Sequence, residues 1–215
     1  MENRDTTFDI EFSKIQGLEW LPWIGINYEN NKYKILIVGE SHYKIDGNNK
    51  YLGKEYTQQC VEDGLIGKED WYTSTYKGMN RLLSGFDTPN TSCKKKLWQN
   101  LGFCNIIQRP MEDQKKRPNK DDFLKGWEIL RKVIDICKPD IIIFIGVTAS
   151  KYCGCKIKSS FKIGTTNARE PIFIKNTNVI FSRHTCRCFS WTKWSKEYLE
   201  KYIPSEIKFL RDSIK

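Results

Sequence analysis

Short apolar runs recur along the chain and are separated by longer segments in which apolar residues return every three or four positions. The clearest runs are 34–38, 140–145 and 178–182, each rich in isoleucine, valine or phenylalanine. Runs of this length and composition predict strands buried on both faces, as in parallel sheets. A short run at 102–107 predicts another strand, and 171–182 predicts a hairpin-like pair around an Asn-Thr-Asn turn.

The intervening segments predict helices, because their apolar residues have helical spacing. The expected helices lie near 73–85, 91–100, 119–138, 193–202 and 204–214. Strands alternating with helices indicate an α/β fold, a three-layer αβα sandwich around a central, mostly parallel four-stranded sheet. Residues 1–215 are expected to form a single domain, with an aromatic lead-in over 1–33. A polar excursion with one short helix over 44–70 is long enough to suggest a functional role.

Two strand ends carry most of the candidate chemistry. The first strand runs into Gly-Glu-Ser-His-Tyr at 39–43, and the last runs into Arg-His-Thr at 183–185. Right-handed crossovers bring the carboxyl ends of parallel strands to one edge, where α/β proteins bind ligands. These two loops contain both histidines of the chain, His42 and His184. A shared site is therefore the first hypothesis.

The composition adds a charge argument. Lysine and arginine number 36 against 26 acidic residues, so the formal net charge is +10. This favours a polyanionic partner, nucleic acid first, although a lysine-rich composition with solvated side chains explains the charge equally well. The longest apolar run, 141–147, is too short to span a bilayer, and the first residues are polar. We expect a cytoplasmic monomer without a membrane partner.

Eight cysteines in a chain without a signal segment predict reduced thiols rather than a disulfide framework. Cys153 and Cys155 form one close pair, and Cys186 and Cys188 form another, but neither has the C-x-x-C spacing common in metal sites. A four-sulfur site built from both pairs remains an alternative. We predict no metal and no other cofactor.

Four short motifs occur in an order that resembles the uracil-DNA glycosylase superfamily. They are Gly-Glu-Ser-His-Tyr at 39–43, a strand ending in Phe-Cys-Asn at 103–105, a strand ending in glycine at 146, and His-Thr-Cys-Arg-Cys at 184–188. The resemblance covers about residues 33–195, and it is the order of the motifs that makes it specific. It implies hydrolysis of the bond between deoxyribose and uracil, or a related damaged base, flipped out of single- or double-stranded DNA.

The resemblance also implies roles for individual residues. His184 would stabilise the departing base, and Asn105 would read the edge of uracil with its donor and acceptor. Glu40, with Ser41 and His42 as further catalytic candidates, would steady the oxocarbenium-like sugar or activate water. The remaining expected contacts are Gly39, Tyr43 and Phe103 around the base, with Trp71 or Tyr76 as alternative stacking partners, and Arg183, Arg187 and Phe189 against DNA.

The chain departs from the superfamily's motifs at three positions. His42 stands where the proline of the first motif falls. Ser41 stands where the water-activating aspartate commonly falls, although one branch carries its acid one position earlier, as Glu40 does here. Thr185 stands where proline is usual. Two alternatives therefore stay open: a nucleic-acid-binding module without glycosylase activity, and a hydrolase of free nucleosides or nucleotides. Plainer roles also stay open, since Glu40 could cap the next segment, Asn105 could be a turn residue and His42 could lie on the surface.

Overall fold

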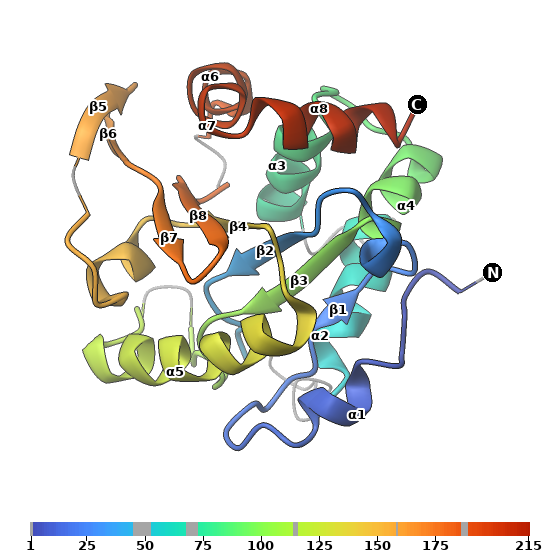
Figure 1. The fold of residues 1–215 in the computed structure, drawn as a ribbon, viewed down its shortest axis with the longest axis vertical. Coiled ribbons are helices and arrows are strands. Elements are labelled where there is room, and N and C mark those ends of the chain that lie inside the picture. The colour runs from blue at the N-terminus through green and yellow to red at the C-terminus, as the bar shows by residue number, and fades with distance from the viewer. Residues whose placement is uncertain (1, 45–52, 68–72, 114–115, 158, 186–188) are drawn as a thin grey trace.

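The computed structural model describes residues 2–44, 53–67, 73–113, 116–157, 159–185 and 189–215. It has a mixed α/β fold around a six-stranded sheet (Figure 1), with strand order β1-β3-β2-β4-β8-β7. The strands are β1 (Trp23–Ile24), β2 (Ile35–Gly39), β3 (Leu101–Asn105), β4 (Ile141–Ile145), β7 (Ile172–Ile174) and β8 (Thr177–Ser182).

The four central strands, β3, β2, β4 and β8, run parallel, while β1 and β7 pair antiparallel at the two edges. The expected α/β fold with a mostly parallel sheet is therefore confirmed, but the expected strand number of four is too low. β1 has only two residues, too few to show an alternating pattern. β7 is the first strand of the expected pair at 171–182, and it forms one edge of the sheet beside β8.

Alternate residues of the central strands face two separate hydrophobic clusters. Ile35 and Ile37 of β2 belong to one cluster, and Leu36 and Val38 belong to the other. The first cluster includes α3 (Thr73–Ser84), α4 (Thr91–Gln99) and the C-terminal helices, and the second includes α1 (Asp9–Phe12) and α5 (Lys120–Cys137). Figure 1 shows these helices on opposite sides of the sheet. Burial on both faces explains why the strands read as continuous apolar runs.

The helices follow the sequence pattern closely. α5 begins at the capping box of Asn119 and Asp122, in which each side chain accepts a hydrogen bond from the other residue's backbone N–H. It ends at Lys138, which has a left-handed φ of 43° and precedes Pro139. The C-terminal pair is α6 (Trp191–Trp194) continued by η6 (Ser195–Leu199) and α7 (Glu200–Tyr202), and then α8 (Pro204–Asp212).

Some elements differ from the expectation. The described part of the 44–70 excursion contains α2 (Tyr56–Gln59) and a π-helical segment, η3 (Cys60–Ile66). A two-stranded sheet of β5 (Ser159–Ile163) and β6 (Thr166–Arg169) follows β4 and was not predicted. The short 3-10 helices are η1 (Tyr28–Asn30) and η5 (Thr148–Tyr152). Among the described residues, no helix combines the length and the apolar character that a membrane span requires.

Candidate functional site

Glu40 and His184 lie at the same edge of the sheet. β4 separates their strands and sets the register, since Val38 pairs with Phe144 and Phe144 with Phe181. Glu40 lies two residues past Val38, and His184 lies three residues past Phe181. Adjacent strands are about 4.8 Å apart, so the ends of β2 and β8, with β4 between them, are about 10 Å apart. The loops that carry Glu40 and His184 therefore begin close together at this edge.

Glu40 is a largely buried carboxylate with one charged partner. Its side chain is 10% exposed, and its Oε2 accepts a hydrogen bond of 2.6 Å from Nη2 of Arg117, which is 54% exposed. Its Oε1 is buried and accepts no hydrogen bond from the described residues. Burial raises the pKa of Glu40 and the positive charge of Arg117 lowers it, with a net rise. A desolvated carboxylate with a free oxygen is suited to bind water or a developing positive charge.

His184 is half-buried, and no described residue forms a hydrogen bond with its ring. Burial lowers the pKa of His184, and the positive charge of Arg117 lowers it further. The imidazole is therefore neutral near pH 7, and a neutral ring has one N–H donor and one acceptor. Because Arg117 acts on both Glu40 and His184, the two side chains belong to one electrostatic environment.

The loop that carries His184 is anchored to α3. Thr185 is fully buried, and its Oγ1 donates a hydrogen bond of 2.8 Å to the backbone carbonyl of Thr75. Gly78 lies so close that an added Cβ would be 2.8 Å from both Cβ and the carbonyl oxygen of Thr185. The threonine at this position thus fixes the loop by a side-chain hydrogen bond.

Asn105 ends β3 beside Gly39. It is buried, and a Cβ added to Gly39 would lie 2.2 Å from Asn105 Oδ1 and 3.3 Å from the ring of Phe103. Gly39 is therefore needed so that the Asn105 amide can approach the backbone of β2. Phe103 is a core residue that packs edge-on against Trp98, with ring centroids 5.9 Å apart.

A narrow pocket opens between the ends of β2 and β4 on the α5 side of the sheet. Glu40, Phe123 and Ala149 form part of its wall, together with Gly146, which has a left-handed φ of 144°. The pocket has room for about one water molecule. It can hold a water beside Glu40, and a flipped base would have to lie further out.

His42 does not share the surroundings of His184. Its ring is 5% exposed and packs edge-on against Trp20 and Tyr56, at centroid distances of 4.9 and 4.6 Å. Its Nε2 is 2.8 Å from Oγ1 of Thr57, and its Nδ1 is 3.9 Å from Sγ of Cys60. Burial lowers the pKa of His42 to about 3. The ring is thus a neutral part of a buried cluster, and the surface position considered from the sequence is wrong.

The residues on either side of His42, Ser41 and Tyr43, are half-buried. Oγ of Ser41 is buried and makes no hydrogen bond with the described residues. The backbone of Tyr43 pairs with Met111 in an isolated parallel bridge, and its side chain is half-buried. This bridge connects the loop after β2 to the segment that precedes α5.

The expected DNA contacts are only partly described. Arg183 is half-buried, and Phe189 stacks on Trp194 with ring centroids 6.4 Å apart. Arg187 and Trp71 lie outside the described residues. Tyr76 is half-buried and packs against the core, where desolvation raises its pKa.

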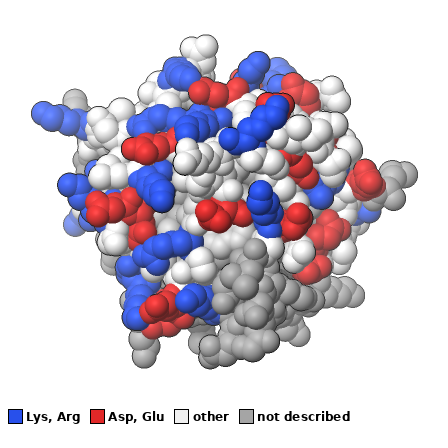
Figure 2. Space-filling model, turned by 90° about the horizontal axis from the view of Figure 1, so that it is seen from below, with Lys and Arg blue, Asp and Glu red and all other residues white. Residues whose placement is uncertain are grey.

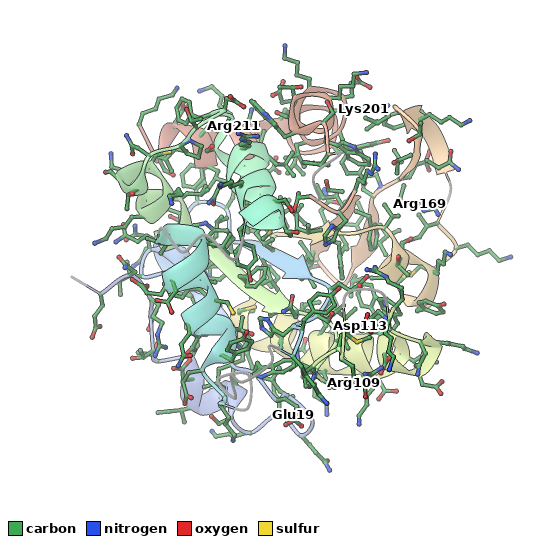
Figure 3. All side chains as sticks on the ribbon, turned by 180° about the vertical axis from the view of Figure 1, so that it is seen from behind. Glu19, Arg109, Asp113, Arg169, Lys201 and Arg211 are labelled. Atoms are coloured by element: carbon green, nitrogen blue, oxygen red, sulfur yellow. The ribbon has the colours of Figure 1, made fainter. Side chains whose placement is uncertain are left out.

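The positive charge around the site is largely paired. Arg109 donates two hydrogen bonds to the Asp122 carboxylate, at 2.7 and 2.6 Å, and Lys116 pairs with Glu112. In Figure 3 the arrowhead of β2 points toward the segment that carries the labelled Arg109 and Asp113. Figure 2 shows basic and acidic side chains interspersed over the face seen from below. This face is not a uniformly positive track.

Sequence reasoning missed Arg117. Its side chain reaches Glu40 across 77 positions of the chain. The one signal in the sequence is its place in a basic, proline-punctuated segment that follows the strand ending at Asn105. That segment comes after a strand end, so it lies near the edge where ligands bind.

The described residues contain no group of three or more metal-binding side chains. Cys153 is buried, and its Sγ lies 3.4 Å from the backbone nitrogen of Cys155, which is exposed. Cys186 and Cys188 lie outside the described residues, so the structure does not test the four-sulfur alternative.

Comparison with models of known protein families gives no match to the chain, and comparison with curated proteins gives none either. The site itself must therefore support any functional assignment.

Proposed function

We propose that this protein hydrolyses the N-glycosidic bond of uracil, or of a related damaged base, in DNA, on a three-layer domain of the uracil-DNA glycosylase type. The observation that carries the proposal is the pair of Glu40 and His184. They lie at one edge of a parallel sheet, on strands separated only by β4, and both are under the influence of Arg117.

Glu40 acts on the sugar side of the bond. Breaking the base–sugar bond leaves positive charge on the sugar ring, and a carboxylate shielded from water stabilises that charge. The oxygen bound to Arg117 keeps the group in place, while the other oxygen is available to orient a water molecule. The narrow pocket beside Glu40 fits such a water.

His184 acts on the base side. As the bond breaks, negative charge gathers on the base, and the N–H of a neutral imidazole stabilises it by a hydrogen bond. A charged imidazolium would bind an anion before the reaction begins, so a ring that stays neutral discriminates better between the starting and transition states. The lowered pKa of His184 suits this role.

Asn105 reads the base. A buried amide presents one donor group and one acceptor, which matches the paired edge of uracil. Gly39 leaves the space that the Asn105 side chain needs. DNA would contact the exposed parts of the loops that follow β2 and β8.

The proposal is tested with oligonucleotides that contain one uracil. After incubation with the protein, alkaline treatment cleaves the strand wherever a base has been released. We expect the wild-type protein to release uracil and the Glu40→Gln and His184→Ala variants to release at least about a hundredfold less. Glu29→Gln, which neutralises an exposed glutamate whose side chain is 53% accessible, is the matched control and should be fully active.

The same experiment separates the alternatives. Salt-sensitive DNA binding without strand scission for any modified base would favour a binding module, a function that the serine at position 41 also motivates. Release of a base from free nucleosides, with little dependence on salt, would favour a small-molecule hydrolase. Either result would replace the proposed function.

A further inference from the structure

Hydrogen bonds hold the residues that precede and follow Arg117 in the chain. The backbone of Met111 donates to the carbonyl of His42 and accepts from Lys44, at 2.8 Å each. Arg109 binds Asp122 in the first turn of α5 through two hydrogen bonds. The same Asp122 forms the capping box of the helix with Asn119. Asn119 lies two residues after Arg117. Residues on both sides of Arg117 are thus fixed to the loop after β2 and to α5.

The guanidinium meets a carboxylate that has no other charged partner among the described residues. Nη2 of Arg117 lies 2.6 Å from Oε2 of Glu40, and the Glu40 side chain is far more buried than that of Arg117. A nearly buried carboxylate loses hydration, and one close cation compensates for part of that loss. The neighbouring basic side chains cannot substitute, because Arg109 and Lys116 bind Asp122 and Glu112 instead.

We propose that Arg117 is a positioning residue of this site, which holds the Glu40 carboxylate in place and in its charged form and maintains a positive charge beside His184. The inference rests on the proposed function for its catalytic consequence, but not for the physical arrangement. Arg117 acts on both groups in the same direction: it favours charged Glu40 and neutral His184, which are the forms that the proposed reaction needs.

The positive charge of Arg117 changes the pKa values of Glu40 and His184 in the same direction. Arg117 lowers the pKa of Glu40 against the opposing effect of burial, and it lowers the pKa of His184 in the same direction as burial. Removing the positive charge therefore raises both pKa values. Besides Arg117, the nearest charged residue along the chain is Arg183, which precedes His184. Charged Glu40 and neutral His184 then occur together only at higher pH, so the acid limb of the activity profile shifts to higher pH.

The first test uses the free protein without substrate. The chain has two histidines, so NMR titration follows the imidazole protons of two rings, and the signals that are absent in His184→Gln identify His184. We expect Arg117→Gln to shift the His184 curve to higher pH and Arg117→Lys to keep it close to the wild-type curve. Lys116→Gln removes a neighbouring exposed charge and should shift nothing. Superimposable His184 curves for wild type and Arg117→Gln would overturn the inference.

The second test uses the activity profile with uracil-containing oligonucleotides. Arg117→Gln should move the acid limb to higher pH and Arg117→Lys should restore it, while a purely structural role would lower activity equally at all pH values. An unchanged acid limb in Arg117→Gln would also contradict the role. If the wild-type protein releases no base but the His184 curve still shifts, the proposed function fails and the electrostatic inference stands.

Discussion

The amide oxygen of Asn105 lies 2.2 Å from the point where a Cβ on Gly39 would stand. No real side chain tolerates that distance, so these two residues on neighbouring parallel strands constrain each other. Backbone hydrogen bonds strengthen the contact, since the N–H of Ile106 donates to the carbonyl of Gly39 at 3.0 Å. The strand end that carries Glu40 is thereby held against the strand end that carries Asn105.

Gly39→Ala is expected to displace the Asn105 amide. Overpacking of this kind costs about 1–3 kcal/mol in the free energy of unfolding. Uracil release should fall as well, because the base-reading group moves. Chemical denaturation and the strand-scission assay measure the two effects.

A double variant provides the control. Gly39→Ala combined with Asn105→Ala removes the group that the new methyl would meet, so part of the lost stability should return. Additive losses in the double variant would show that the contact between these two residues is not the cause.

Thr185 and Thr177 offer a matched pair of buried hydroxyls. Each donates a hydrogen bond to a backbone carbonyl, Thr185 to Thr75 at 2.8 Å and Thr177 to Pro139 at 2.7 Å. Replacement by valine should destabilise both variants by about 1 kcal/mol, with similar falls in midpoint in urea. Only Thr185→Val should reduce uracil release, because only Thr185 anchors the loop of His184. Equal activity in the two variants would contradict a role for this anchor.

His42 should make the protein sensitive to acid. Its pKa is about 3 in the folded protein because of burial, against an ordinary value of about 6.5 in an unfolded chain. The unfolded state therefore binds a proton first as the pH falls below about 6.5, and stability drops by up to about 1.4 kcal/mol per pH unit until the folded pKa is reached. Denaturation midpoints measured between pH 7 and pH 4 would follow this loss.

The control for this prediction is His42→Gln. It should be less stable than wild type at pH 7, because the contact with Thr57 and the ring packing change, but its stability should depend less on pH. The difference between the two proteins isolates His42, since His184 and the carboxylates titrate in both. A pH dependence identical in wild type and variant would disprove the assignment.

The central strands and the long helices could be predicted from the sequence because their signals are local. A few consecutive residues suffice in both cases: the apolar run ending at Gly39 predicts β2, and the capping residues Asn119 and Asp122 predict the start of α5. β1 was not predicted because it consists of Trp23 and Ile24 alone, and two residues cannot show an alternation of apolar and polar positions. β5 and β6 were missed because few of their residues are apolar, and the alternation of Phe161 and Ile163 spans only three positions.

Proximity at the edge of the sheet was also predictable, since the carboxyl ends of parallel strands converge there. The environment of each side chain was not. His42 is buried by Trp20 and Tyr56, which lie more than ten residues away in either direction, and no local pattern indicates that packing. The ion pair of Arg117 with Glu40 depends in the same way on how a distant segment is held.

The central claim is that Glu40 and His184 act on the same bond, and a double-mutant cycle tests it most directly. Single-turnover release of uracil is measured for wild type, Glu40→Gln, His184→Ala and the variant with both changes. Residues that act as one unit are not additive, so we expect the double variant to be about as slow as the slower single variant. Wild-type rates in either single variant, or losses that simply multiply in the double variant, would contradict the claim.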